Sequence, residues 1–393
     1  MLNTPFAPWP CFTKEESDAV SRVLLSNRVN YWTGDETTEF ENEFAAFSGA
    51  RHAIAVSNGT VALDLALRAI DIQPGDEVIV TPRTFIASAS CATILGAVPV
   101  FADVDANSQN ITAETIRPVI TKKTRAIVCV HLAGWPCEMD AMMALAADHG
   151  IAVIEDCAQA TGATYRGQSV GVLGHIGAWS FCQDKIVTTG GDGGMITTND
   201  KALWSHMWSF KEHGKSWDAT HNTEPADRYR WVHESFGTNG RMVEMQAAIG
   251  RIQLARLPEW IERRTANAMR IAEVCRAHTA VRVPEVPAHL KHAYYKFYAF
   301  VRPERMAPGW TRDRIIDTLR SEGVPSYSGI CPEVYLEKAF DQGPGRPAQR
   351  LPVARELGET SLMFLVHPTL TDDQIDKTCS VLDAVLSRAE SSR

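Results

Sequence analysis

Residues 151–195, IAVIEDCAQATGATYRGQSVGVLGHIGAWSFCQDKIVTTGGDGGM, are the stretch that decides the fold of this chain. Residues 151–155 form an apolar run that ends in an acid, and Asp156 follows, which predicts a buried strand with a carboxylate at its carboxyl end. Residues 176–181 predict a second buried strand, followed by Lys185 and a cluster of glycines. Because glycines let a backbone approach a ligand closely, the stretch predicts a site at these strand ends.

Each of these residues has an ordinary interpretation when it is taken alone. Lysines are usually solvated, an aspartate after a strand more often caps a turn or helix, and glycine clusters usually form turns. Lys185 and Asp156 together, however, match the requirements of pyridoxal phosphate chemistry. A lysine amine forms an imine with that cofactor, and a carboxylate keeps its pyridine nitrogen protonated so that the ring accepts electrons.

Seven segments in a characteristic order carry a resemblance to a known family. On them the chain resembles the DegT/DnrJ/EryC1/StrS sugar aminotransferases, which are fold type I pyridoxal-phosphate enzymes, and the resemblance covers nearly the whole chain. The segments are SNGTVALDLAL from Ser57, GDEVIVTPRTFIASA from Gly75, GAVPVFADVD from Gly96, EDCAQATGA from Glu155, WSFCQDK from Trp179, GGDGGM from Gly190 and GTNGRMVEMQAAIGRIQL from Gly237.

The expected fold class is α/β, a three-layer sandwich with a mainly parallel sheet and a smaller C-terminal α+β domain. Strands that alternate with helices predict a parallel sheet covered on both faces, and the motifs fall at the carboxyl ends of predicted strands. We place the large cofactor-binding domain, with an N-terminal arm, at residues 1–255 and the small domain at residues 256–393. Two helices are predicted at residues 242–257 and 260–278, separated by Pro258.

The resemblance implies that pyridoxal 5'-phosphate is the cofactor, and it assigns most of the site. Lys185 would hold the cofactor and transfer the proton, and Asp156 would face the ring nitrogen. Phe85 would stack on the ring and Gln159 would bond its hydroxyl group. The cofactor phosphate would bind at Gly59, Thr60 and Ser180; without the resemblance, residues 57–58 are more simply read as a helix cap.

The resemblance also implies a homodimer with shared sites. Asn239 would reach the cofactor phosphate of the neighbouring subunit, although it and Arg241 could be ordinary turn residues. Tyr31, Trp32 and Thr33 lie in a stretch that borders the substrate pocket in the family, and we take them and Arg241 as candidates for binding the sugar. The alternative for residues 31–33 is a surface loop with incidental aromatics.

The function implied is transfer of an amino group from L-glutamate to a nucleotide-linked keto-sugar, for surface polysaccharide or glycoside biosynthesis. A 4-keto-6-deoxy hexose is preferred to a 3-keto sugar because it is common in the family. Thr161 and residues 328–333 depart from histidine-bearing family patterns near the expected sugar pocket, so the ring position stays open.

Two alternatives are a sugar dehydratase of the same fold, which Lys185 disfavours because such dehydratases carry histidine there, and a non-catalytic cofactor-binding regulator. A Rossmann dehydrogenase is excluded because GGDGG lacks the GxGxxG spacing.

Composition excludes several classes of protein. The chain has 393 residues and a net charge of −8, which argues against a nucleic-acid partner. No apolar run is long enough to span a bilayer, and the N-terminal segment lacks the pattern of a secretory signal. Nine cysteines without a CxxC pair suit a reducing cytoplasm, where we expect the protein. The twelve histidines show no ligand spacing, so no metal site is expected.

Overall fold

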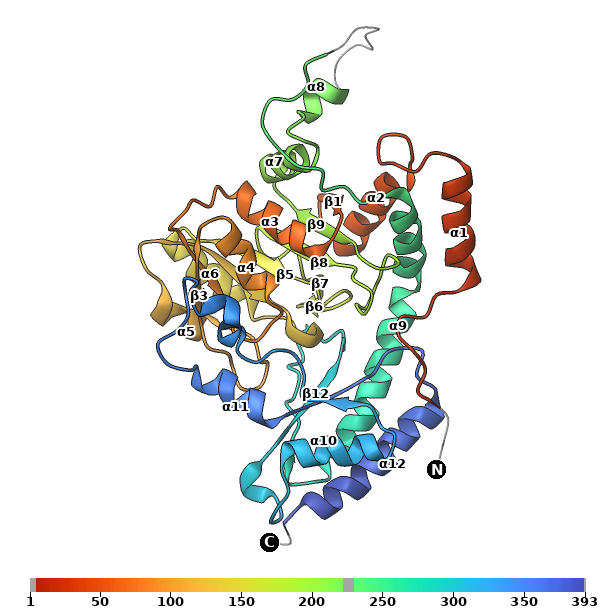
Figure 1. Ribbon diagram of the computed structural model, residues 1–393, viewed down its shortest axis with the longest axis vertical. Helices are drawn as coiled ribbons and strands as arrows, with labels where there is room; N and C mark the ends of the chain where they lie inside the picture. Colours follow the sequence, from red (N-terminus) through yellow and green to blue (C-terminus); the bar gives the residue numbers. More distant parts are fainter. Residues whose placement is uncertain (1–4, 222–229, 392–393) are drawn as a thin grey trace.

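A seven-stranded sheet forms the centre of the computed structural model, which describes residues 5–221 and 230–391 (Figure 1). The strand order is β1-β9-β8-β5-β4-β2-β3. Strand β9 runs antiparallel to both its neighbours and every other pair is parallel, so the predicted mainly parallel sheet is confirmed. The strands are β1 (His52–Val56), β2 (Glu77–Val80), β3 (Val98–Phe101), β4 (Thr124–Val130), β5 (Ala152–Asp156), β8 (Ile176–Ser180) and β9 (Gly194–Thr198).

Helices cover both faces of this sheet. Successive side chains along a strand point to opposite faces, and both sets are mainly apolar here, so both faces must be buried. In β2, Val78 and Val80 enter one hydrophobic core and Ile79 enters another. Helices α3, α4 and α7 cover the first face, and α2, α5, α6 and part of α9 cover the second, which confirms the three-layer sandwich. Their bounds are α2 (Glu36–Ser48), α3 (Gly59–Ala69), α4 (Ala87–Ile94), α5 (Ala113–Ile116), α6 (Met139–His149), α7 (Lys201–Lys211) and α9 (Glu244–Arg276).

The C-terminal part contains its own four-stranded antiparallel sheet, in the order β10-β12-β14-β13. Its core is shared with the end of α9 and with α10 and α12. A further small sheet has the order β11-β6-β7. The bounds are β6 (Thr164–Tyr165), β7 (Gln168–Ser169), β10 (Val281–Arg282), β11 (Leu290–Lys291), β12 (Phe297–Val301), β13 (Ser326–Tyr327), β14 (Ser361–Phe364), α10 (Arg312–Ser321), α11 (Pro352–Thr360) and α12 (Asp372–Ala389).

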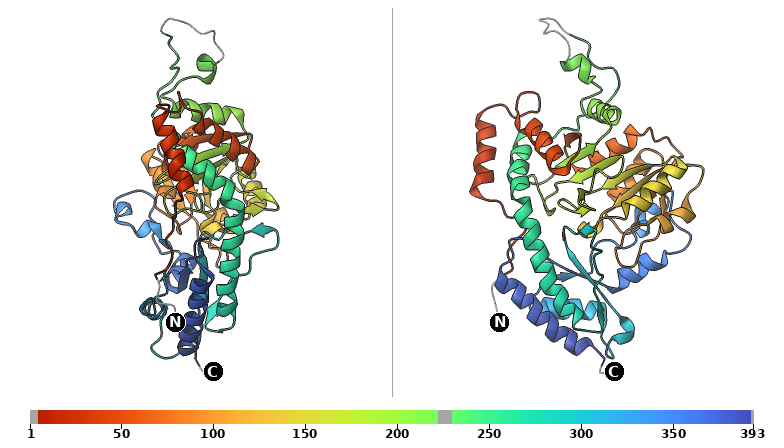
Figure 2. Two further views of the ribbon diagram at one scale, coloured as in Figure 1. Left: turned by 90° about the vertical axis from the view of Figure 1, so that its right-hand side faces the viewer. Right: turned by 180° about the vertical axis from the view of Figure 1, so that it is seen from behind.

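Helix α9 corrects one prediction. We expected two helices separated at Pro258, but the structure has one helix of 33 residues with Pro258 inside it. A proline inside a helix costs about 3 kcal/mol, because it removes one hydrogen bond and crowds the preceding turn. Pro258 lies on an exposed side, and the helix packs on α1 and α2 in one half and on α12 in the other. Burial along both halves therefore offsets the local cost, and α9 links the two parts of the molecule (Figure 2).

The N-terminal arm runs from the C-terminal part of the molecule to α1 (Lys14–Leu25), which lies against α9 (Figure 1). A capping box begins this helix: the backbone N–H of Thr13 donates to Glu16 at 2.7 Å. Short 3-10 helices occupy Arg117–Val119, Leu132–Gly134, Pro303–Arg305, Val334–Leu336 and Lys338–Phe340.

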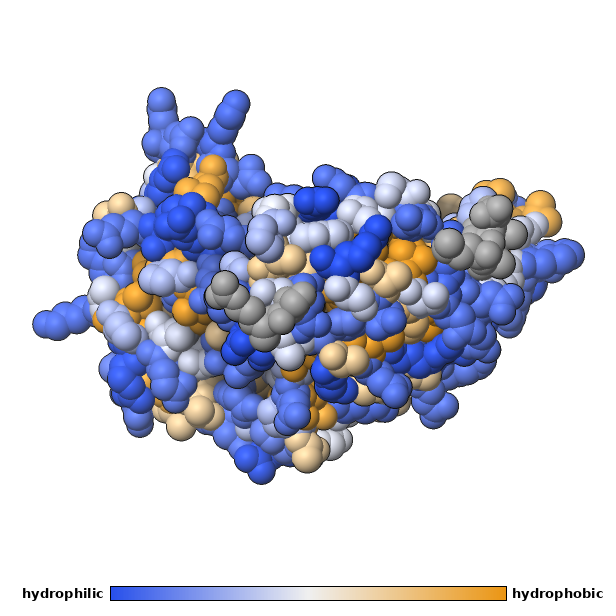
Figure 3. All heavy atoms as spheres, turned by 90° about the horizontal axis from the view of Figure 1, so that it is seen from below, coloured by the Kyte–Doolittle hydropathy of each residue, from blue (hydrophilic) through white to orange (hydrophobic). Residues whose placement is uncertain are grey.

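Helix α8 (Trp217–His221) lies in a segment that projects from the body at the top of Figure 1. The sequence after this helix, which is polar and aromatic without a clear period, predicts an excursion from the fold, and residues 222–229 of it lie outside the described residues. At the opposite end, the surface seen from below is mainly hydrophilic, with hydrophobic groups in small patches between hydrophilic ones (Figure 3). None of the helices in the described ranges combines the length and apolar character needed to cross a membrane.

Candidate active site

A cavity of about 1130 Å³ opens at the carboxyl ends of the central strands, between the large sheet, the N-terminal arm and the C-terminal part. Its size suits a cofactor with a substrate beside it, because pockets for small ligands span about 300–1,000 Å³. Seven of the residues proposed from the sequence line this one cavity: Gly59, Thr60, Phe85, Asp156, Gln159, Ser180 and Lys185.

Asp156 ends strand β5, and its carboxylate is held in a fixed orientation. Oδ2 accepts the hydroxyl hydrogen of Ser88 at 2.7 Å, and Oδ1 accepts the backbone N–H of Ala158 at 3.1 Å. The residue is 5% exposed and lines the cavity. A positioned, largely dehydrated carboxylate of this kind is suited to hold a proton on a heterocyclic nitrogen.

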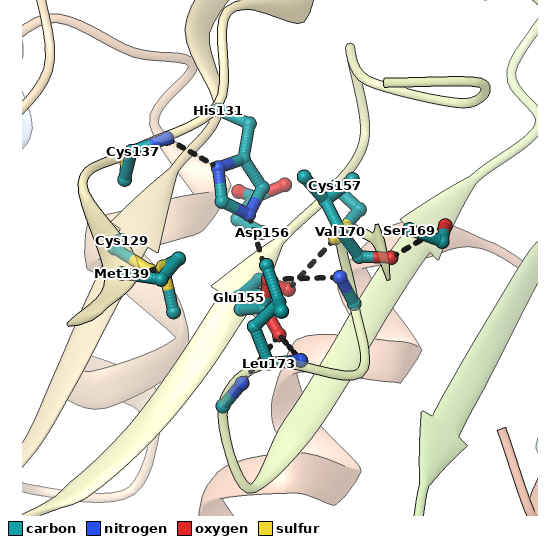
Figure 4. A network of polar contacts seen from close by, with 12 residues as sticks. Cys129, His131, Cys137, Met139, Glu155, Asp156, Cys157, Ser169, Val170 and Leu173 are labelled. Atoms are coloured by element: carbon teal, nitrogen blue, oxygen red, sulfur yellow. Dashed lines mark hydrogen bonds and ion pairs between the residues drawn. The ribbon is translucent and has the colours of Figure 1, made fainter. Parts of the chain in front are cut away.

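Glu155, the preceding residue, supports this strand end (Figure 4). Its carboxylate accepts the backbone N–H groups of Gly171, Leu173 and Gly174 at 2.6–2.8 Å, and it lies 2.9 Å from Nε2 of His131. The backbone N–H of Cys137 donates to Nδ1 of His131, so Nε2 carries the hydrogen in the neutral ring. The network ties the loop after β7 to the end of β5, and sequence reasoning missed it.

The same network contains a group that could bind a metal. Ligand atoms of His131, Glu155 and Cys157 all lie within 4.8 Å of one another, and all three residues are buried. The carboxylate already accepts four hydrogen bonds, which accounts for its burial without an ion. The expectation that the chain has no metal site stays a prediction.

The N-terminus of α3 provides an anion seat. The side chain of Asn58 accepts the N–H of Val61 at 2.9 Å, which leaves earlier N–H groups of the helix for a ligand. A Cβ atom at Gly59 would lie 2.7 Å from Cβ of Ser180, so only glycine allows the hydroxyl of Ser180 so close to this helix. Thr60 lines the cavity beside them. Backbone and hydroxyl donors therefore converge where a phosphate would be stable.

Two further side chains can contact a flat ring with polar substituents, one by stacking and the other by donating a hydrogen bond. Phe85 is 64% exposed although it lies in a cavity, so an apolar ring face is available for stacking. The side-chain oxygen of Gln159 accepts the backbone N–H of Ala133 at 2.8 Å. Its NH₂ group is thereby left as a donor on a side chain that lines the cavity.

Lys185 presents an amine that can react. It is half-buried, and its Nζ lies 5.2 Å from the ring centroid of Tyr295. Among residues 5–221 and 230–391, no hydrogen bond or ion pair holds this Nζ. The indole N–H of Trp9 donates to the backbone carbonyl of Lys185 at 2.9 Å, so the N-terminal arm anchors the segment that carries the lysine.

These residues fit pyridoxal phosphate. The cavity contains a phosphate seat at a helix N-terminus, an exposed aromatic face, a fixed carboxylate, an amide donor and an unpaired amine. Each of these five features suits one chemical group of that cofactor. The donors and charges differ in kind, so the match does not depend on a single feature.

The remaining sequence candidates gather elsewhere, around the buried carboxylate of Glu212. Trp32 donates its indole N–H to this carboxylate at 3.1 Å, and Nε of Arg241 donates at 2.6 Å. Arg241 also donates to the side-chain oxygen of Asn239 at 3.2 Å, and Lys211 Nζ lies 3.9 Å from the ring centroid of Tyr31. The described lining of the cavity includes none of the four candidates Tyr31, Trp32, Asn239 and Arg241.

Thr33 is exposed and also lies outside the cavity; its hydroxyl donates to the backbone carbonyl of Asn30 at 3.2 Å.

Several cavity residues had no signal in the sequence. They come from the N-terminal arm and from the C-terminal part, and they include Trp9, Tyr295, Lys296, Tyr298 and His367.

The fold and the site define a pyridoxal-phosphate enzyme of fold type I. The model of the DegT/DnrJ/EryC1/StrS aminotransferase family matches residues 10–383, and the chain belongs to this family. It is therefore an aminotransferase, and pyridoxal 5'-phosphate is its cofactor.

Known proteins resemble the chain over nearly its whole length. A solved aminotransferase from Psychrobacter cryohalolentis is 60% identical, with a TM-score of 0.96 over 98% of this chain and 99% of that one. A UDP-N-acetyl-3-dehydro-alpha-D-glucosamine 3-aminotransferase of Acidithiobacillus ferrooxidans is 37% identical over 98% of this chain and 96% of its own length. A GDP-perosamine synthase of Caulobacter vibrioides is 39% identical over 88% of this chain and 89% of its own length.

Proposed function

We propose that this aminotransferase moves the amino group of L-glutamate to a nucleotide-linked keto-sugar, a 4-keto-6-deoxy hexose, and so makes an amino sugar for polysaccharide or glycoside biosynthesis. The relatives named for nucleotide sugars support the substrate class. The observation that carries the reaction type is the unpaired amine of Lys185 in one cavity with the fixed carboxylate of Asp156.

The cofactor, when bound, supplies an aldehyde that bonds to amines and a ring that accepts electrons. Lys185 Nζ would hold it and, once released, would move the proton from the α-carbon of the donor to the C4′ carbon of the cofactor. In the second half-reaction it would move a proton from C4′ to the keto carbon of the sugar. Gly59, Thr60 and Ser180 would bind its phosphate. Phe85 would cover one ring face and exclude water there.

Asp156 and Gln159 would contact polar groups of the ring. Asp156 would keep the proton on the ring nitrogen, with its carboxylate fixed by the hydroxyl of Ser88. Gln159 would donate to the ring hydroxyl from its NH₂ group, because its oxygen already accepts the N–H of Ala133.

The function is tested first with purified wild-type enzyme loaded with cofactor. L-Glutamate should convert the absorbance band of the cofactor to that of its amine form, and a 4-keto-6-deoxy hexose nucleotide should restore it. Mass spectrometry should then show the amino sugar. No response to glutamate would contradict the donor. A product that has lost water instead of gaining an amino group would favour the dehydratase, and activity only on 3-keto sugars would correct the ring position.

The active form proposed is a homodimer with sites shared between subunits. Asn239 and Arg241 lie outside the cavity of their own subunit, which supports a role for them at the site of a second copy. The projecting segment that precedes them carries Trp231 and Phe236, which are 86% and 98% exposed. Large exposed aromatics on a projection favour an interface. In such a dimer Asn239 would bind the partner's cofactor phosphate, and Tyr31, Trp32, Thr33 and Arg241 would border the sugar pocket.

Mixed subunits test the shared site. Asn239→Asp places a negative charge against the phosphate, and Lys185→Ala removes the amine, so each homodimer should be nearly inactive. In a hybrid with shared sites, one site carries both defects and the other carries none. Equal mixing should therefore restore about a quarter of the wild-type activity. If each subunit supplied its own Asn239, mixing would restore nothing.

The cytoplasm is the proposed location, because all nine cysteines are free thiols and four of them are exposed or only partly buried.

The division into a large domain at residues 1–255 and a small domain at residues 256–393 also stays a proposal. It is supported by the separate C-terminal core, although α9 runs across the boundary.

A further inference from the structure

One side of the active-site cavity carries more positive than negative charge. Lys185, Lys296 and His367 line it, and Arg264 lies behind Trp9, with its guanidinium carbon 5.0 Å from the centroid of that ring. The acid on this side, Asp184, accepts the hydroxyl hydrogen of Tyr295 at 2.5 Å. This cationic side is defined here by Lys185, Lys296 and Arg264.

Arg264 is a buried cation without an acidic partner in the described part of the chain. It is 1% exposed, and Nη1 donates to the backbone carbonyls of Tyr294 and Tyr295 at 3.3 Å. Its Nε and Nη2 have no partner among the described atoms. Burial lowers the pKa of Arg264 to about 9. An anion in the adjoining cavity would offset this uncompensated charge.

Lys296 faces the same cavity and also lacks a hydrogen bond or ion pair within the described residues. Its Nζ lies 4.8 Å from the ring centroid of Tyr295, the same ring that Lys185 Nζ approaches to 5.2 Å. Burial lowers the pKa of Lys296, the charge of Asp184 opposes this, and the charges of Arg264 and Lys185 lower it further. The resulting pKa is about 8, so the amine is still mostly protonated at pH 7.

His367 shows the same positive environment. Burial, with the charges of Arg264 and Lys296, lowers its pKa to about 3, so the ring is neutral. Its Nδ1 lies 2.8 Å from the hydroxyl of Thr369, which donates onward to the backbone carbonyl of Pro8. The imidazole therefore holds the N-terminal arm in place and adds no charge of its own.

We propose that Lys296 binds a carboxylate group of the amino donor, beside Lys185. Lys296 lines the cavity without an ion-pair partner among the described residues, so a carboxylate beside it would satisfy its charge while Lys185 holds the cofactor. The donor is the better source of that anion than a sugar nucleotide, because its α-carboxylate is bonded to the carbon whose proton Lys185 takes. The phosphates of a sugar nucleotide are several bonds away from the keto carbon. The cofactor phosphate has its own seat at α3. The inference rests on the proposed function.

The test uses cofactor-loaded wild type and Lys296→Met, with glutarate as an inert dicarboxylate and UDP as a nucleoside diphosphate. Calorimetry should show glutarate bound about 10- to 100-fold more weakly by the variant, as for one lost charge-assisted hydrogen bond, and UDP bound equally. In stopped-flow absorbance the half-saturating L-glutamate concentration should rise by a similar factor, while the limiting rate changes less than about threefold.

Controls separate charge from folding. Lys296→Arg should retain most glutarate binding, and Lys291→Met, which removes an exposed lysine on β11, should change nothing. Equal glutarate binding by wild type and Lys296→Met would overturn the inference, and so would a loss confined to UDP. Failure of the proposed function appears instead in the wild type, as no response of the cofactor absorbance to L-glutamate.

Discussion

Replacement of Lys185 by alanine is expected to lower the rate of amino transfer by about 10³-fold or more, because one amine both holds the cofactor and transfers the proton. Nothing in the described structure substitutes for it at that position. The amine of Lys296 lies beside the same tyrosine ring, but we assign it to the donor's carboxylate. The rate of both half-reactions, followed by absorbance, gives the measurement.

The Lys185→Ala protein should still bind the cofactor, since Gly59, Thr60 and Ser180 remain. Equilibrium dialysis should show this, while the absorbance band of the lysine-bound form disappears. Lys291→Ala is the matched control for loss of a lysine, and it should behave as wild type. Amino transfer by Lys185→Ala within tenfold of wild type would contradict the role of this residue.

Asp156→Asn is expected to reduce the rate by about 10²- to 10³-fold, through loss of the charge that keeps the ring nitrogen protonated. The replacement keeps the shape of the side chain, so the cavity should be preserved. Single-turnover absorbance with L-glutamate measures the rate, and the half-saturating concentration should change much less than the limiting rate.

Ser88→Ala tests the orientation of the Asp156 carboxylate separately from its charge. It leaves the carboxylate in place but removes the hydrogen bond of 2.7 Å that aims it. We expect a loss of about tenfold, in the range of one buried hydrogen bond to a charged group. If Asp156→Asn were no slower than Ser88→Ala, the charge of Asp156 would not be what the reaction requires.

Several residues of the cavity were predictable because they follow strands. Asp156, Ser180 and Lys185 each lie at or just after the end of an apolar run, and parallel strands bring such ends to one edge of the sheet. Gly59 and Thr60 begin a helix directly after a strand, for the same reason. Their presence in one cavity agrees with the prediction, while their individual roles stay to be tested by substitution.

The residues that sequence reasoning missed come from distant segments. Trp9 and His367 meet although more than three hundred positions separate them, and their rings are 5.9 Å apart. Nothing in their local patterns distinguishes them from ordinary core aromatics. Lys296 lies beside β12, where a lysine would ordinarily be read as a surface residue. Only the tertiary structure shows that it lines the cavity.

The sequence by itself determined the order of the elements and which strands end in functional side chains, because these features depend on periodicity and on neighbours along the chain. The cofactor was implied by the resemblance to a known family, together with Lys185 and Asp156. Tertiary structure alone decided that α9 continues through Pro258, that Asn239 lies outside the cavity, and that Lys296 lies on the cationic side of the cavity. These outcomes depend on packing between distant segments, whose free energy outweighs local preference and cannot be read from any one stretch.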